Sequence, residues 1–168
     1  MAYLADRLPA FLATLRVVAK EARLLAKSRA RLVSSGRITG DWVERLETDD
    51  ARAEQVEAFA SRFARMQDTV VDRLLPRLWS LEGTRSGSAI DSLNRAERAG
   101  LITSAARWLE IRGLRNAMVH EYMEDPSKFA AALNRADAFC EESIHAYRQV
   151  RSYARDTLGI DVSALPEL

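Results

Sequence analysis

The sequence has few of the residues that build cross-links, metal sites and tight turns. It contains one cysteine, two histidines, seven glycines and four prolines in 168 residues. A single cysteine, Cys140, excludes an intramolecular disulfide and suits a reducing compartment. With so few Cys and His side chains, we expect no metal site and no cofactor.

Long apolar runs are lacking as well. No stretch approaches the roughly 18 apolar residues that span a bilayer. The opening stretch "MAYLADRLPAFLATLRVVAKEARLLAK" has no uninterrupted apolar core followed by a cleavage site, so it does not have the pattern of a secretory signal. We therefore expect a cytoplasmic protein that does not associate with a membrane.

The residues that are abundant favour helices. Ala, Leu, Arg and Glu dominate, and all four are good helix formers. Apolar side chains recur at helical spacing in three long segments and two shorter ones. The sequence therefore predicts an all-α, antiparallel up-and-down bundle of four helices with an additional short helix. It forms one domain over residues 1–158, followed by a C-terminal tail at 159–168, which is either loose or tied to a neighbouring surface.

Local signals set the expected helix boundaries. Pro9 is tolerable only in a first turn, so the first helix should begin near it, at about Asp6, and run to Val33. Pro76 should kink or end the second long helix. A short helix is expected over residues 89–98, ended by Gly100. Candidate N-caps of the other helices are Thr48 or Asp49, Thr103, and Asp125, the last followed by Pro126.

Charge is segregated along the chain, although the net charge is only +1. Residues 1–33 carry seven basic and two acidic side chains, whereas residues 41–60 carry two basic and seven acidic ones. The two segments are either helix faces that attract each other, a basic surface for a phosphate-bearing partner, or ordinary solvated faces. The small net charge argues against non-specific coating of long nucleic acids but leaves room for a local basic site.

The stretch "LRNAMVHEY", residues 114–122, concentrates chemically versatile side chains near the expected end of a helix. Asn116 and His120 share a face one turn apart, whereas Arg115 and His120 are about 140° apart around the helix. A histidine can act as general acid or base near neutral pH, and an arginine can bind phosphate. Together they can cleave RNA without a metal. The alternative is a histidine that is only solvated or paired with the helix dipole.

The same stretch resembles a motif of the HEPN superfamily, and within it the HepT type. That motif is an arginine, usually a polar residue, three variable positions, a histidine, any residue and a tyrosine. Here these positions are Arg115, Asn116, three variable residues, His120, Glu121 and Tyr122. The flanking "LNRAERAGLI" and "WLEIRGL" are also similar to the family, whereas the first half of the chain resembles it only in helix pattern.

The resemblance implies a homodimer in which the arginine and histidine of both protomers line one cleft. It implies a toxin of a toxin–antitoxin pair that is a metal-independent endoribonuclease. His120 would be the general acid/base, Arg115 the phosphate stabiliser and Asn116 an orienting residue. The antitoxin would be a small nucleotidyltransferase that transfers AMP to Tyr122. Independently of the resemblance, Arg112 lies one turn before Asn116 and either widens the RNA-binding or phosphate-binding patch or is an ordinary surface arginine.

Two other functions fit the same residues. The chain could be a non-catalytic helical partner that presents substrate to a nucleotidyltransferase, because some relatives keep the bundle without cutting RNA. It could also be a purely structural dimer. The intact motif at Arg115 to Tyr122 favours the ribonuclease over the non-catalytic partner.

Overall fold

The computed structural model describes the backbone of residues 2–33, 36–85, 87–120 and 124–168, and all side chains in these ranges except those of residues 2–5, 116, 117, 119 and 120. In the described residues there is no strand. The α-helices are α1 Ala2–Val33, α2 Gly40–Glu44, α3 Asp50–Thr69, α4 Leu75–Leu81, α5 Ala89–Arg98, α6 Ala105–His120 and α7 Pro126–Asp156. A 3-10 turn, η1 (Arg45–Thr48), follows α2, and a π-helical turn, η2 (Val70–Leu74), joins α3 to α4.

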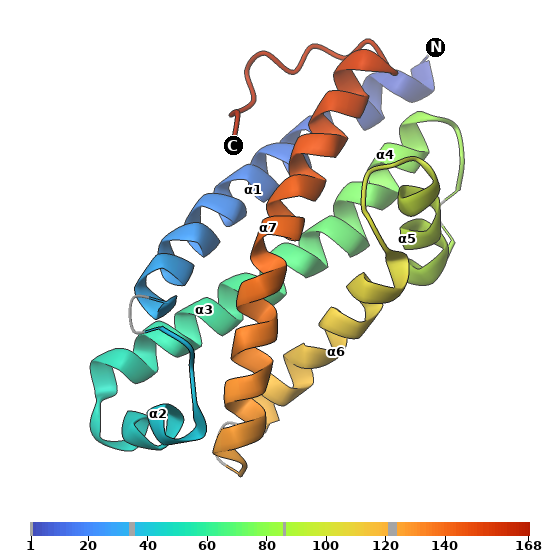
Figure 1. Cartoon of the computed structure of the whole chain (residues 1–168). Helices are drawn as coiled ribbons and strands as arrows, with labels where there is room; N and C mark the ends of the chain where they lie inside the picture. Colours follow the sequence, from blue (N-terminus) through green and yellow to red (C-terminus); the bar gives the residue numbers. More distant parts are fainter. Residues whose placement is uncertain (1, 34–35, 86, 121–123) are drawn as a thin grey trace.

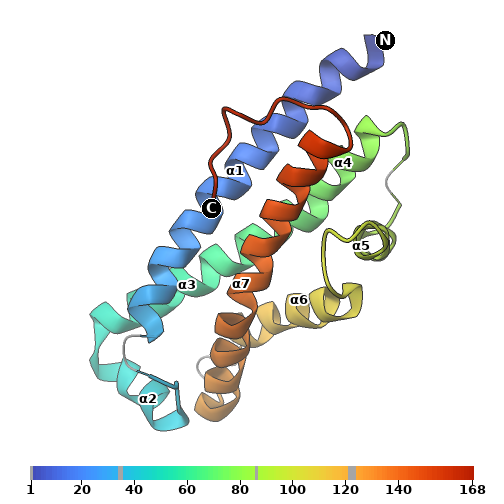
Figure 2. The same ribbon diagram turned by 45° about the horizontal axis from the view of Figure 1, so that its top comes forward.

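The long helices form an up-and-down bundle. Its four antiparallel members are α1, the continuous rod of α3, η2 and α4, then α6 and α7 (Figure 1). The helix α3 packs against α1, α6 and α7, whereas α1 and α6 do not touch within the described residues. The view in Figure 2 looks along α5, which therefore lies crosswise beside α4 and α6. This arrangement confirms the predicted all-α bundle.

Aromatic side chains hold three of these helices together. Phe63 of α3 meets Phe139 of α7 edge-on, with ring centroids 6.4 Å apart, and Trp108 of α6 meets the same Phe139 at 5.1 Å. All three residues are at most 1% exposed. Edge-to-face contacts at such distances add to the large apolar area that each ring buries. This cluster fixes α6 against α3, and so positions the residues of interest on α6.

Several helix boundaries agree with the sequence prediction. Asp49 caps α3 by accepting a hydrogen bond from the Arg52 N–H at 3.0 Å. Asp125 caps α7 in the same way through the Lys128 N–H, and Pro126 is the first helical residue. Gly100 adopts a φ of 71° just after α5, a conformation that favours glycine. These signals succeed because each depends on local backbone geometry.

Two predicted boundaries are wrong. The helix α1 begins at Ala2 and contains Pro9, whose missing N–H costs one bond close to the end of a 32-residue helix. Thr103 does not cap α6. Its neighbour Ser104 accepts from the Arg107 N–H at 3.2 Å, and the Glu97 carboxylate of α5 accepts from the Ala105 N–H at 2.7 Å. Ser104 therefore caps α6, and a carboxylate from α5 provides a second acceptor at its N-terminus.

The predicted disruption at Pro76 takes the form of the π-helical turn. Leu75, the residue before Pro76, donates its N–H to the carbonyl of Val70, five positions earlier. The wider turn adds a residue just where a proline ring would crowd the carbonyl four positions back. The rod from α3 to α4 thus continues, but the residues after Thr69 are shifted from the register of a regular α-helix.

The last ten residues are tied to the bundle. Val162 and Leu165 are buried, and the Tyr147 hydroxyl of α7 donates to the Pro166 carbonyl at 2.6 Å. The tail returns beside α7 and α1 (Figure 1). No helix of the described residues is both long enough and apolar enough to cross a bilayer.

Candidate active site

The residues singled out in the sequence lie at the C-terminal end of α6. His120 is the last residue of this helix, and Arg115 and Asn116 lie about one turn before it. Because α6 remains helical through both positions, Arg115 and His120 are about 140° apart around the axis and roughly 7.5 Å apart along it. The side chains of Asn116 and His120, and the whole of Tyr122, lie outside the described residues.

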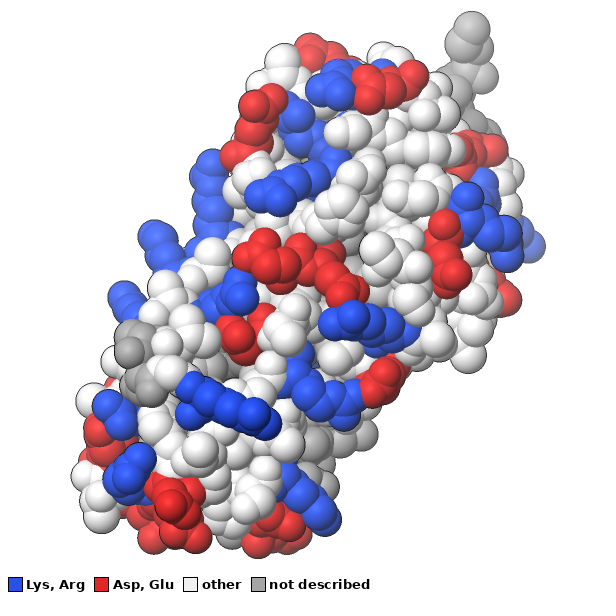
Figure 3. All heavy atoms as spheres, viewed as in Figure 1, with Lys and Arg blue, Asp and Glu red and all other residues white. Residues whose placement is uncertain are grey.

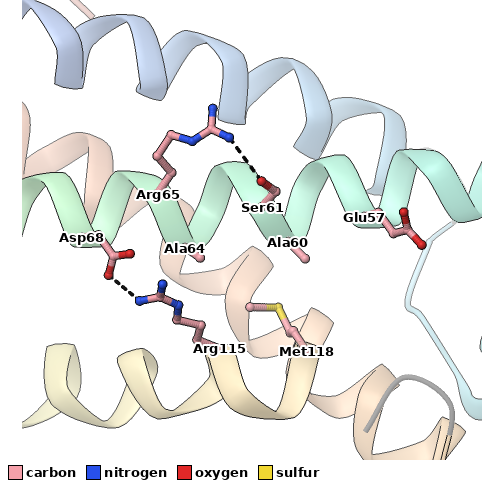
Figure 4. A pocket seen from close by; sticks show the side chains of 8 residues that line it. All are labelled: Glu57, Ala60, Ser61, Ala64, Arg65, Asp68, Arg115 and Met118. Atoms are coloured by element: carbon pink, nitrogen blue, oxygen red, sulfur yellow. Dashed lines mark hydrogen bonds and ion pairs between the residues drawn. The ribbon is translucent and has the colours of Figure 1, made fainter. Parts of the chain in front are cut away.

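Arg115 is directed from α6 towards α3. Its Nη1 donates to the Oδ1 of Asp68 at 2.6 Å, and the Arg115 side chain is 46% exposed (Figure 4). Asp68 accepts from one of the five N–H groups that a guanidinium carries. The remaining donors and the exposure leave Arg115 able to bind a phosphate as well.

Arg112, one turn earlier, is more firmly held. Its two terminal nitrogens donate to the two carboxylate oxygens of Asp72 at 3.1 and 2.9 Å. Its Nη2 also lies 3.7 Å from Asp68. A two-pronged pair of this kind is the strongest form of an arginine–carboxylate contact, so Arg112 is less available to a ligand than Arg115.

The four charges form a ladder because α3 and α6 are antiparallel. Asp68 of α3 and Asp72 of η2 are one turn apart. They face Arg115 and Arg112, which are three residues apart on α6. The two cations and two carboxylates cancel. A phosphate at Arg115 would therefore have to displace Asp68 or share the guanidinium with it.

A groove begins at this ladder and follows α3 and α6. It has a volume of about 560 Å³, within the usual range for small-molecule sites. In Figure 4, Asp68 and Arg115 face each other at one end, Glu57 lies at the other, and Arg65 turns away towards Ser61. Small side chains on α3 leave the space open. The groove is lined by Glu57, Ala60, Ser61, Ala64, Arg65, Asp68, Arg115 and Met118.

Asp68 and Asp72 are not among the site residues predicted from the sequence. They are the two acids of "MQDTVVDRL", four residues apart on a helix whose other face is apolar. That spacing shows that they share a face, but nothing local shows that α6 lies opposite. Asp72 also lies in the π-helical turn, a feature found frequently at functional sites.

The remaining candidate groups offer little reactivity. No three metal-binding side chains (His, Cys, Asp or Glu) cluster within the described ranges. Burial raises the pKa of the Cys140 thiol to about 12, so it remains protonated near neutral pH and is a poor nucleophile. The other histidine, His145, lies exposed on α7.

No protein-family model matches the chain, and neither does any curated protein or solved structure.

Proposed function

We propose that this chain is the toxin component of a toxin–antitoxin pair and acts as a homodimeric, metal-independent endoribonuclease of HEPN type. One observation carries the proposal. Arg115 is an exposed arginine with unused donors and lies at one end of the groove. It belongs to α6, the helix that ends at His120. The resemblance of "RNAMVHEY" to the HepT motif suggests that Arg115 and His120 together cleave RNA.

The reaction needs only a proton acceptor and a phosphate-binding cation. His120 takes the proton from a ribose 2′-hydroxyl, and the oxygen attacks the adjacent phosphorus. The bond from phosphorus to the 5′-oxygen of the next nucleotide breaks, and that oxygen receives from His120 the proton that His120 took from the 2′-hydroxyl. Arg115 stabilises the charge on the non-bridging oxygens, and Asn116 orients His120. The products are a 2′,3′-cyclic phosphate and a free 5′-hydroxyl.

The helix geometry favours a site made by two chains. Within one α6, positions 115 and 120 are about 140° apart, so they face different directions. A homodimer that brings two α6 helices together would let Arg115 of one chain and His120 of the other approach the same phosphate. The exposure of Arg115 is compatible with such an arrangement.

Inhibition of the toxin by its antitoxin would act through Tyr122, the tyrosine of the motif. A small nucleotidyltransferase would catalyse attack of the Tyr122 oxygen on the α-phosphorus of ATP, forming a tyrosyl–AMP bond and releasing pyrophosphate. The added phosphate places negative charge two residues from His120, where it repels RNA and blocks access. Intact mass after co-expression with a neighbouring nucleotidyltransferase tests this step, because AMP addition should disappear in Tyr122→Phe.

The two histidines provide a matched test of catalysis. His120→Ala is expected to reduce RNA cleavage by about two orders of magnitude or more, because it removes the general acid/base. His145→Ala changes the exposed histidine of α7 and should cleave like the wild type. Cleavage is followed by gel electrophoresis, and the dimer by light scattering. Equal cleavage by His120→Ala and the wild type would refute the proposal.

A second function, a non-catalytic partner of a nucleotidyltransferase, has one observation in its favour. Arg115 and Arg112 are already neutralised by Asp68 and Asp72. Toxicity on expression separates the two functions. Growth arrest that is lost in Arg115→Ala but kept in Arg98→Ala, which changes an exposed arginine of α5, supports the ribonuclease. No arrest, with a stable complex between the chain and a nucleotidyltransferase, supports the partner.

A further inference from the structure

A row of basic side chains follows the solvent-exposed face of α1, and we propose that it binds the phosphate backbone of RNA away from the groove. We name this set the α1 row. The identity of the ligand as RNA rests on the proposed function, whereas the row itself is a feature of the described surface. The α1 row consists of Arg16, Lys20, Arg23, Lys27 and Arg31.

The spacing of the row places its members on one face. Successive members are three or four residues apart, which keeps them within an arc of about 80°. The row extends over roughly 22 Å, with about one positive charge per helical turn. All five residues are exposed. Basic side chains project along the left edge of Figure 3, where α1 lies in Figure 1.

No acidic side chain interrupts this surface of α1. Between Arg7 and Val33 the helix has one acid, Glu21, which is 9% exposed and accepts a hydrogen bond from Thr69 of α3. Among the described residues, Arg16, Lys20 and Lys27 have no ion-pair partner. A surface of this kind attracts a partner with repeating negative charge.

Basic side chains elsewhere behave differently. Arg29, on another side of α1, pairs with Asp137 and Glu141 of α7 at 2.7 and 2.6 Å. On α6, Arg112 and Arg115 pair with carboxylates of η2 and α3. The contrast shows that the bundle has acids available to neutralise arginines, whereas the stretch of α1 that carries the row has no exposed acid.

A nucleic-acid strand fits the row better than a membrane does. Membrane-surface helices need an apolar face that enters the lipid. The apolar face of α1 is used by the core, because Phe11, Leu15, Val18 and Leu25 are fully buried. Of the large apolar side chains of α1 that the structure describes, Leu24 and Val33 are exposed, each 39%, and two such residues are too few for the apolar face of a membrane helix. The extended line of positive charge suits electrostatic contact with successive phosphates.

The α1 row is too far from Arg115 to contact the phosphate that Arg115 binds. In the described residues α1 makes no contact with α6, and α3 and α7 pack between them. The row would therefore hold a different part of the strand from the part in the groove. It would add affinity for long RNA through non-specific phosphate contacts, with the strong salt dependence of such contacts.

The test is carried out in the full chain with His120→Ala, so that RNA is not cut during the measurement. Binding of fluorescein-labelled polyuridine is measured by anisotropy over a range of salt concentrations. The row variant combines Lys20→Gln, Arg23→Gln and Lys27→Gln. A control variant combines Arg45→Gln, Arg85→Gln and Arg98→Gln, which alters the net charge equally at exposed arginines outside α1.

We expect the row variant to bind polyuridine at least tenfold more weakly at low salt. Its slope of log affinity against log salt should fall by about two, because about 0.7 counterions are released per phosphate contact on a single strand. The control variant should retain most of the affinity. If both variants bind polyuridine equally weakly, the loss of affinity is explained by net charge alone, and the proposal is overturned.

Two further probes identify the ligand class. Polyglutamate bound as tightly as polyuridine, and weakened equally in the row variant, would overturn the assignment to nucleic acid. Vesicles containing phosphatidylserine that bind where polyuridine does not would also overturn it. Cleavage by the protein with His120 intact is measured separately, so failure of the ribonuclease proposal is distinguishable from failure of the row.

Discussion

Glu21 gives a prediction about stability that can be worked out from its surroundings. Its side chain is 9% exposed, and the Thr69 hydroxyl donates to its Oε1 at 3.0 Å. Its Oε2 is buried and has no hydrogen-bond partner among the described residues. Burial raises the pKa of Glu21 above its ordinary value of 4.5, against the opposing effects of the Thr69 hydrogen bond and of Arg65 and Arg73.

Glu21→Met should therefore stabilise the protein. Methionine fills a similar volume without a buried carboxylate, and Thr69 retains its other acceptor, the Arg65 carbonyl at 3.0 Å. A buried acceptor without a partner costs about 1–3 kcal/mol. Allowing for imperfect packing, we expect a gain of about 1–2 kcal/mol, or roughly 3–6 °C in melting temperature for a chain of this size.

The pH dependence has a defined sign. A carboxyl group with a raised pKa in the folded protein binds its proton more tightly when folded than when unfolded. Its contribution to stability is complete below pH 4.5 and is lost as the pH rises through the raised pKa. The advantage of Glu21→Met over the wild type should consequently be smallest near pH 4.5 and largest at pH 8.

Thermal unfolding followed by circular dichroism at several pH values measures this difference. Glu54→Met is the matched control, because Glu54 is an exposed residue of α3 and should show little change. A Glu21→Met variant that is less stable than the wild type at pH 8 would contradict the predicted cost of the buried carboxylate. A difference in stability between Glu21→Met and the wild type that does not vary with pH would contradict the raised pKa of Glu21.

Two other predictions concern Asp68 and Cys140. Asp68→Asn should tighten polyuridine binding about fivefold at low salt, since a carboxylate about 5 Å from a phosphate costs on the order of 1 kcal/mol in a solvated site. Asp72→Asn, the control beside Arg112, should have a smaller effect, and weaker binding by Asp68→Asn would contradict competition for Arg115. Iodoacetamide at pH 8 should leave Cys140 of the native protein unmodified, because its pKa is about 12. Rapid modification, detected by mass spectrometry before unfolding, would contradict that burial.

The sequence predicts those parts of the fold that depend on neighbouring residues. The short helix over residues 89–98 and the start of α7 at Pro126 are confirmed, because capping side chains and glycine conformations act within a few residues. The bundle itself is confirmed because apolar stripes must meet in a common core. The predicted N-cap of α6 is wrong by one residue, because Ser104 instead of Thr103 accepts from the Arg107 N–H, and the second acceptor, Glu97 of α5, comes from another helix.

The candidate site was predictable only on α6. The arginine, asparagine and histidine of the motif lie within six consecutive residues, 115–120, so their common helix follows from periodicity. Asp68 lies 47 positions before Arg115, and their pairing depends on how α3 and α6 pack. The π-helical turn that contains Asp72 has no sequence signal besides the proline that follows it.

The charges of α1 and α6 lead to opposite expectations for stability and binding. Neighbouring cations on a helix repel by about 0.2–0.5 kcal/mol per pair, so the α1 row destabilises the helix by about 1 kcal/mol. Neutralising Lys20, Arg23 and Lys27 should therefore raise the melting temperature while weakening RNA binding, whereas damage to the fold would lower both. Arg112→Gln should instead lower the melting temperature, because it leaves the Asp72 carboxylate without its two hydrogen bonds. A row variant that melts at a lower temperature than the wild type would contradict the idea that these cations reduce stability and are present to bind a partner.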